Sequence, residues 1–379
     1  MGVSMNFRNG NSISIGKFLG LGFFTSFLMV YIYAKSIYVA YVLLSFTLML
    51  FAYVNYIKNF YKIDKICRVF ISLVFIVSLL NGIVYGNIKS NIMINISLLL
   101  PLSVSTLDIK LVHIKKGLIS TSLFALACVA LQVEFNVFGY INSNTLSFLS
   151  YMGISVAFIW FKYARNKVVP SLYLIISYIY ILKTGSRNVA IVILICFVLL
   201  LLPQKFWKNA WFFRSICIVA LLYTVFAMYI MEWGFDNVKI AEWLDEYVNR
   251  FSEKGWEMES RVDYLALEQY NLQSKGIVEQ LFGSGILKHM GHNLFYQTAF
   301  TYGYLGTLFI YIIYYFVFEM AYRIIKRDNN MIVLGCVIIM IGHFFIQGAD
   351  VYMLGAETCI VMPAIIMGLI MQQYREMCK

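Results

Sequence analysis

The sequence has few prolines, which interrupt helices, and few charged residues, which make a protein soluble. Four prolines and 13% charged residues occur in 379 positions, whereas 61% of the residues are hydrophobic. So little charge excludes a soluble globular protein of this length, and the apolar stretches are long enough to cross a hydrocarbon layer about 30 Å thick. The composition therefore predicts an all-α polytopic membrane protein.

Apolar runs of helical length predict about twelve transmembrane helices. No small-residue cleavage site follows the first run, so a removable signal peptide is not expected. The chain is predicted to divide into three regions. Residues 1–231 contain nine spans, residues 232–292 form a loop subdomain, and residues 293–379 contain three spans and a tail. The predicted spans are 18–34, 37–57, 69–86, 92–107, 117–135, 146–161, 168–182, 188–203, 212–231, 293–321, 331–347 and 351–372.

Lysine and arginine lie mainly in the connections on one side of the membrane. With an inside N-terminus, 20 of the 30 basic residues lie in cytoplasmic connections or tails. Outside the long loop, the opposite side holds Lys35, Lys89, Lys183 and Arg187. Because cytoplasmic loops are enriched in positive charge, both termini are predicted to be cytoplasmic and the long loop to lie on the other side.

The net charge of +11 does not indicate nucleic-acid binding, because the basic residues are scattered over short loops. The long loop, 232–291, has the opposite balance, with 11 acidic and 6 basic residues. All seven cysteines lie outside this loop. Disulfides and cysteine-bound metals are therefore not expected.

The connection Lys183-Thr184-Gly185-Ser186-Arg187 places two positive charges on the outer side, where they are disfavoured. Both side chains can reach lipid head groups, which is one interpretation. In the other, Gly185 allows a tight turn and Ser186 caps the next helix. Arg187 then stands at a helix N-terminus, where a phosphate group binds well.

Two arginines of the long loop are further candidates for phosphate binding. Arg250 either pairs with nearby acidic residues or acts as an accessory ligand. Arg261 begins an amphipathic run, so packing can fix it while its guanidinium group binds phosphate through two hydrogen bonds. Apolar spacing predicts helices at 238–251 and 262–270 in this loop.

His289 and His292 precede the tenth span. Their spacing could hold a metal, but no carboxylate or thiol is adjacent in sequence, so neither a metal nor a cofactor is predicted. An interfacial histidine without chemistry is the simple alternative. Histidine is nevertheless suited to proton transfer near neutral pH, and we expect His292 to project from the first turn of this helix as a general base.

His292-Asn293, followed after nine residues by Gly303 and after two more by Gly306, resembles the signature of bacterial O-antigen ligases and O-antigen polymerases. The turn ending at Arg187 matches the same superfamily in the same order. So does Arg261 followed by Leu281-Phe282-Gly283-Ser284-Gly285. The resemblance covers roughly residues 170–320.

The resemblance implies a GT-C-like membrane glycosyltransferase of the bacterial inner membrane, with a periplasmic active site and glycan linked to undecaprenyl pyrophosphate as donor and acceptor. It implies catalytic roles for His292, Arg187 and Arg261. Lys183, Ser186, Arg250 and Asn293 are expected to bind substrate beside these arginines. The compact, aromatic-rich chain favours a polymerase, which would act with a chain-length regulator, over a ligase that transfers finished glycan to lipid A core.

A transporter or flippase for lipid-linked glycan is the alternative from another class. Asp350, Glu357 and His343 would then line a substrate path, since ionisable groups within spans are often functional. They could also form hydrogen bonds between helices. Turnover separates the classes, because an enzyme lengthens glycan whereas a transporter moves it intact.

Overall fold

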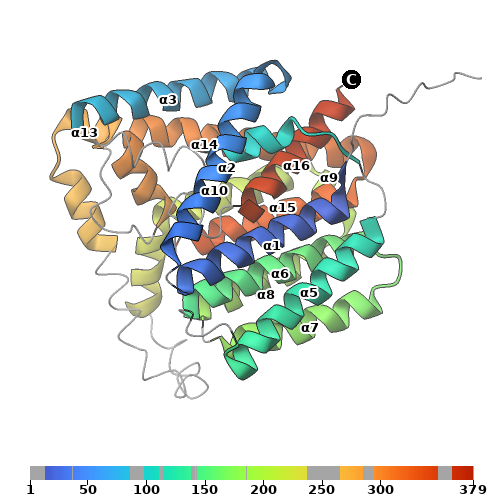
Figure 1. The fold of residues 1–379 in the computed structure, drawn as a ribbon. Coiled ribbons are helices and arrows are strands. Elements are labelled where there is room, and N and C mark those ends of the chain that lie inside the picture. The colour runs from blue at the N-terminus through green and yellow to red at the C-terminus, as the bar shows by residue number, and fades with distance from the viewer. Residues whose placement is uncertain are drawn as a thin grey trace, which may run out of the picture.

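The computed structural model describes residues 13–35, 37–85, 98–110, 114–137, 141, 143–184, 186–236, 265–284, 293–348 and 361–378. Within these ranges the fold is almost entirely helical (Figure 1). Residues 98–105 and 265–273 are also helical. The elements are β1 (Ile13–Ser14), α1 (Ile15–Ala34), α2 (Tyr38–Lys58), η1 (Phe60–Lys62), α3 (Lys65–Tyr85), β2 (Ile109–Lys110), α5 (Ile114–Phe135), α6 (Ser143–Tyr163), α7 (Val168–Lys183), α8 (Arg187–Leu201), α9 (Gln204–Lys208), α10 (Ala210–Asp236), α13 (Ile277–Phe282), α14 (Leu294–Asp328), α15 (Met331–Gln347) and α16 (Val361–Met377).

Most predicted spans coincide with a helix. The range 331–347 is α15, and 18–34 and 117–135 lie within α1 and α5. The short helices α9 and α13 were not expected, and α16 is described only from Val361 onward. The loop helix expected at 262–270 is present at 265–273, whereas the one expected at 238–251 lies outside the described residues.

Five helical stretches in the described part of the chain are long and apolar enough to cross a membrane: Lys65–Tyr85, Lys115–Phe135, Leu146–Tyr163, Ala210–Ala227 and Leu294–Asp328. Their neighbours α7, α8 and α15 are apolar but shorter. Large apolar side chains are exposed on α3, α7 and α8, among them Val84, Leu172 and Leu201. Exposed apolar surface on this scale suits contact with lipid, so length, composition and surface together fit an all-α membrane protein.

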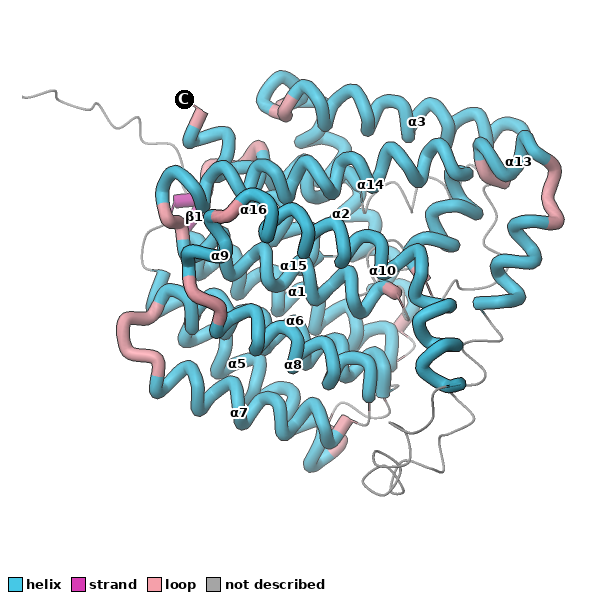
Figure 2. Tube along the Cα trace, turned by 180° about the vertical axis from the view of Figure 1, so that it is seen from behind, coloured by secondary structure: helices cyan, strands magenta, loops and turns pink. Residues whose placement is uncertain are grey.

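Most of the long helices lie in stacked layers that share one general direction (Figures 1 and 2), and α2 crosses them steeply (Figure 1). α5 and α7 form one side and pack on α6; α15 packs on α6, α8, α10 and α16; α14 packs on α10 and α16; and α3 covers α14 on the far side. α15 is the central helix, with nearly all its side chains buried. A two-residue parallel pairing of β1 with β2 ties the start of α1 to the segment before α5.

α1 and α5 cross at unusually close range because glycines face each other. A Cβ atom on Gly16 would lie 2.5 Å from the Cα of Gly117, which is closer than two carbon atoms can approach. One turn further along, Gly20 faces Thr121. Small residues four apart allow this kind of approach between helices in a membrane, where apolar burial contributes little to their association.

The end of the bundle that carries most of the predicted cytoplasmic connections is held together by polar contacts. The Arg323 guanidinium donates to the Tyr374 hydroxyl at 3.0 Å, which joins the ends of α14 and α16. Arg327 donates to the carbonyl of Met377 at 2.9 Å. Gln204, at the start of α9, donates to Asn329 at 2.9 Å. The start of α9, the end of α14 and the end of α16 are therefore joined at one end of the bundle, while α14 begins and α15 ends at the other.

Candidate functional site

The start of α14 is fixed by the side chain of Asn293. This residue is fully buried, and its oxygen caps the helix by accepting hydrogen bonds from the backbone N–H groups of Phe295 and Tyr296. Its amide nitrogen donates to the carbonyl of Thr224 in α10 at 2.7 Å and to that of Gly348, after α15, at 2.8 Å. Asn293 thus connects the start of α14 to α10 and to the residue that follows α15, at the position where the predicted motif begins.

Both amide hydrogens of Asn293 are used within the protein, so the structure gives this side chain a positioning role. Its expected contact with substrate stays a prediction. α14 begins at Leu294, with Asn293 as its cap, so the first turn of the helix starts two residues after position 292. His292 itself lies outside the described residues, as does His289.

The end of α15 also connects α14 to α8. The Asn188 side chain, in the first turn of α8, donates to the carbonyl of Ile346 at 3.3 Å. Two residues later, the carbonyl of Gly348 accepts the bond from Asn293. α8 begins at Arg187, as predicted, although the side chain of Arg187 is outside the described atoms. The helix start at Arg187 and the start of α14 are therefore held by the same end of α15.

Helix 265–273 packs against the first turns of α14. Leu265 and Leu272 form a small buried cluster with Tyr296 and Ala299, separate from the main core. The described helix of the long loop thus packs on the same helix, α14, that carries the predicted motif. Arg261 stands four residues before Leu265 in the sequence; it and Arg250 lie outside the described residues.

The glycines of the two predicted motifs meet in space. Gly283 ends α13 with a φ of 82°, and Gly303 bends α14 with a φ of 69°. The N–H of Ser284 donates to the carbonyl of Phe300 at 3.0 Å. Left-handed backbone at both glycines allows the two segments to lie against each other without a Cβ between them.

Asn81 of α3 joins these two segments. Its side chain is buried, and its amide nitrogen donates to the carbonyls of Phe282 and Thr301, the latter at 3.1 Å. An interrupted helix leaves backbone groups to be satisfied by neighbours. A residue from the first half of the chain therefore completes the arrangement, although no motif surrounds it in the sequence.

The turn between α7 and α8 differs from the prediction in two respects. Ser186 occupies the N-cap position of α8 but its hydroxyl makes no capping hydrogen bond, so the expected cap is wrong. Thr184 instead bonds to Ser147 of α6 at 2.6 Å and to the carbonyl of Ile181. Lys183 forms an ion pair with Glu134 of α5. These contacts of Lys183 and Thr184 anchor the turn to α5 and α6.

Of the residues considered for a transport path, His343 is the one that the structure describes. His343 is buried within α15, one turn before its end, with its ring 5.1 Å from that of Tyr151 in α6. Glu319 of α14 pairs with Arg214 of α10 through two hydrogen bonds, at 2.5 and 3.0 Å, toward the other end of the bundle. Asp350 and Glu357 lie outside the described residues.

Sequence reasoning missed three residues that the structure places around the start and bend of α14. Asn81 had no motif, and Glu268 was counted only as one of the acids in the loop. The third is Lys275, whose ammonium donates to the hydroxyl of Ser284 at 3.1 Å and lies 6.0 Å from the ring centre of Phe300. For Glu268 a signal existed, because it shares a helical face with Leu265 and Leu272.

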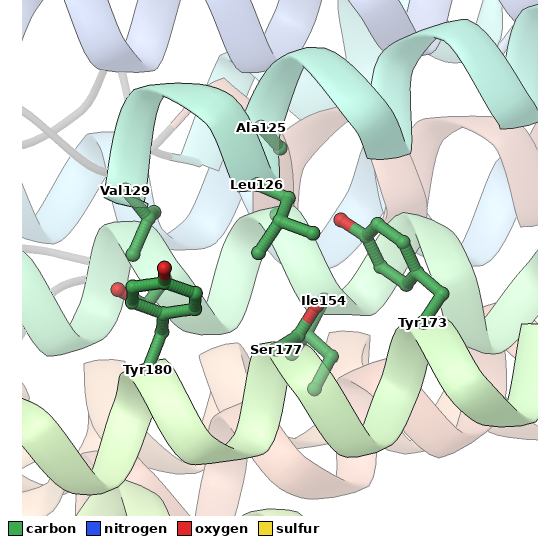
Figure 3. Close-up of a pocket in the computed structure, with 9 residues that line it drawn as sticks. Ala125, Leu126, Val129, Ile154, Tyr173, Ser177 and Tyr180 are labelled. Carbon is green, nitrogen blue, oxygen red and sulfur yellow. The ribbon is translucent and has the colours of Figure 1, made fainter. Parts of the chain in front are cut away.

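A small hollow elsewhere in the bundle has a different character. It lies between α5, α6 and α7 and has room for about one water molecule (Figure 3). Leu126 and Val129 of α5 face Tyr173, Ser177 and Tyr180 of α7 across it. Its lining carries no charged group, which does not suit a diphosphate.

In chemical terms, the start of α14 combines a helix N-terminus, a nearby second helix N-terminus at α8 and a loop helix docked beside them. Asn293 already bonds to N–H groups in the first turn of α14, whereas Ser186 makes no capping hydrogen bond at α8. An anion is favoured at a helix N-terminus, so the start of α8 is the better candidate. No protein-family model matches the chain, and no curated protein matches it.

Proposed function

We propose that the protein is an O-antigen polymerase: an inverting glycosyltransferase that joins oligosaccharide repeat units carried on undecaprenyl pyrophosphate. In this proposal the chain crosses a bacterial inner membrane about twelve times in a GT-C-like arrangement. Both termini are cytoplasmic, and the reaction takes place at the periplasmic face.

One observation carries the proposal. Asn188, next to Arg187, bonds to the end of α15, and Gly348 just after α15 bonds to Asn293 at the start of α14. Helix 265–273, which follows Arg261 in the sequence, packs on the first turns of α14. These links support a site shared by the three motifs.

The proposed chemistry follows from the donor. Breaking a sugar bond to pyrophosphate releases a stable, highly charged leaving group, so the reaction needs positive charge more than it needs a strong acid. The guanidinium groups of Arg187 and Arg261 would bind that diphosphate, with Arg250 and Lys183 as accessory cations. No metal or cofactor enters this proposal, since arginine supplies the positive charge.

His292 would act on the acceptor. As the acceptor hydroxyl attacks the anomeric carbon from the face opposite the diphosphate, the imidazole takes its proton. The new glycosidic bond forms as the bond to pyrophosphate breaks, and the configuration inverts. Undecaprenyl pyrophosphate leaves with the electron pair, and a chain-length regulator would act on the growing product.

Reconstitution tests this proposal against its alternatives. The purified protein is placed in vesicles with purified lipid-linked repeat units, with and without lipid A core. Elongation of the units alone, with release of undecaprenyl pyrophosphate, supports the polymerase. Product formed only with core supports a ligase, and movement of intact units without elongation supports a transporter.

A further inference from the structure

Residues 265–282 of the long loop form two helices joined by a short connection: helix 265–273 and α13. We refer to these residues as the loop hairpin. The side chain of Gln280, in α13, donates to the carbonyl of Gln273 at 3.0 Å and to that of Lys275 at 2.8 Å. The two helices are therefore held in a fixed orientation relative to each other.

The loop hairpin is attached to the end of α3. Asn81, four residues before that end, donates to the carbonyl of Phe282. The hydroxyl of Tyr85, the last residue of α3, donates to the carboxylate of Glu279. α13 lies beside the end of α3 in both views of the fold (Figures 1 and 2). The hairpin thus lies at the end of the bundle where α14 begins.

The outward side chains of the loop hairpin are apolar or aromatic. Ile277 and Val278, at the start of α13, are 77% and 68% exposed. On helix 265–273, one face packs on α14 while the other presents a leucine and a tyrosine. The exposed large side chains of the hairpin are Leu267, Tyr270, Ile277, Val278, Leu281 and Phe282.

The three charged residues of the loop hairpin are turned toward the rest of the protein. Glu268 is buried. The ammonium of Lys275 donates to the hydroxyl of Ser284, and Glu279 accepts the bond from Tyr85. A helix at a water-exposed surface normally has its charged residues on the outer face. The hairpin has the opposite arrangement, which suits an apolar environment.

The exposed apolar residues of α13 begin where those of α3 end. α3 is long and apolar enough to cross a membrane, and Ile83 and Val84 in its last turn are 64% and 70% exposed. Tyr229, two residues after the apolar stretch of α10, accepts a hydrogen bond from Gln269 of the hairpin. Tyrosine is enriched at the level of the lipid head groups. The hairpin therefore joins the bundle at the membrane surface.

We propose that the loop hairpin lies in the membrane interface, with Ile277, Val278 and the exposed apolar residues beside them inserted among the lipids of the adjacent leaflet. Amphipathic segments bind a membrane surface through such an apolar face. Lipid is favoured over a protein partner, because this surface continues the lipid-facing side of α3. The inference concerns where the loop lies, so it goes beyond the proposed function and does not depend on it.

Site-specific photocrosslinking tests this position. Benzoylphenylalanine replaces Val278, Leu79 or Gln273 in separate variants, and the full chain is irradiated in nanodiscs of phosphatidylethanolamine and phosphatidylglycerol. Leu79, 60% exposed on α3, is the lipid-facing control. Gln273, exposed but polar, is the matched control within the hairpin. We expect the yield of phospholipid adduct at position 278 to be within about threefold of that at 79 and at least about tenfold above that at 273.

Mass spectrometry of the crosslinked peptides identifies what each position touches. If the Val278 variant does not fold, Ile277 takes its place, since it is equally open. Crosslinks between two copies of the chain without lipid adduct would overturn the inference in favour of a contact between copies. Irradiation of native membranes extends the test, and crosslinks to another protein instead of lipid would assign the surface to a protein partner.

A lipid yield at position 278 no higher than at position 273 would place the hairpin in water and also overturn the inference. These yields are measured without substrate. Failure of the wild type to lengthen glycan would therefore defeat the polymerase proposal and leave the position of the hairpin as the crosslinks define it.

Discussion

Gly283 and Gly303 lie with their backbones in direct contact, each at a positive φ. A Cβ atom on Gly303 would stand 2.2 Å from the carbonyl oxygen of Leu281, and one on Gly283 would stand 2.5 Å from that of Thr301. No side chain fits at either position. The end of the long loop and the bend of α14 therefore form one unit, and displacing one must displace the other.

Replacement of either glycine by alanine should destabilise the protein strongly. For Gly303→Ala we expect a loss of about 2–5 kcal/mol in the free energy of unfolding, from the left-handed backbone and the clash together. Thermal unfolding in detergent measures it. Gly276→Ala is the control, because its φ is −61° and a Cβ there meets nothing within 4 Å. Equal melting temperatures for both variants would contradict this account of the crossing.

Asn293→Ala removes a cap and two bonds between elements, and we expect it to cost about 2–4 kcal/mol because buried carbonyls lose their donors. Asn293→Asp keeps the capping oxygen but turns a negative charge toward the carbonyls of Thr224 and Gly348, so it should be no better. Asn330, which caps α15 in the same way, provides the comparison. Asn330→Ala should cost only about 1 kcal/mol. Melting temperatures of the three variants decide the order.

Arg187→Ala and Arg261→Ala should each abolish long glycan while the protein still inserts into the membrane. A lost cation at a developing diphosphate lowers the rate by roughly 10²–10³-fold. Glycan ladders from cells and membrane fractionation together give the result. Lys183→Ala should lower the activity less than either arginine variant, because Lys183 is an accessory cation that is already paired with Glu134. Normal ladder length in both arginine variants would show that Arg187 and Arg261 do not stabilise the diphosphate.

His292→Ala should slow elongation by roughly 10²–10⁴-fold, the usual contribution of a general base. Binding of undecaprenyl pyrophosphate should be unchanged, because the imidazole acts on the acceptor. Calorimetry and single-turnover elongation of labelled repeat units measure the two effects separately. A variant that lost donor binding instead would place His292 on the side of the diphosphate.

Gly16→Ala should separate α1 from α5 and lower the melting temperature. The added methyl group meets the backbone of Gly117, which cannot move aside as a side chain can. Gly20→Ala is the graded comparison, because the nearest atom is the side-chain oxygen of Thr121 at 3.0 Å. We expect a loss of about 1–3 kcal/mol at Gly16 and less at Gly20. The reverse order would mean that this crossing is not limited by the glycine pair.

Features of the fold that depend on the local pattern of residues could be predicted from the sequence. Apolar runs located the helices because each must be long and apolar by itself, and α8 begins at Arg187 as the turn signal indicated. The residue pattern did not predict side-chain contacts that depend on segments far apart in the chain. The hydroxyl of Ser186 does not cap α8, and Thr184 reaches Ser147 of α6 instead.

The same limit applies to the candidate site. Asn293 was expected to bind substrate because of its place in the motif, yet its bonds to Thr224 and Gly348 depend on how α10 and α15 pack. Asn81 could not be found at all, since an asparagine within an apolar run has no distinctive neighbours. The roles of His292, Arg187 and Arg261 stay predictions.

The bonds of Asn81 have a consequence for the order in which the protein is made. Its partner carbonyl at Thr301 lies 220 residues later in the chain, so at ribosomal rates roughly 10–45 s pass between their synthesis. During that interval α3 can already be in the lipid with a polar amide awaiting its acceptors. Assembly must therefore finish late, with α14 closing against α3, and chains truncated before that helix would be exposed to membrane proteases.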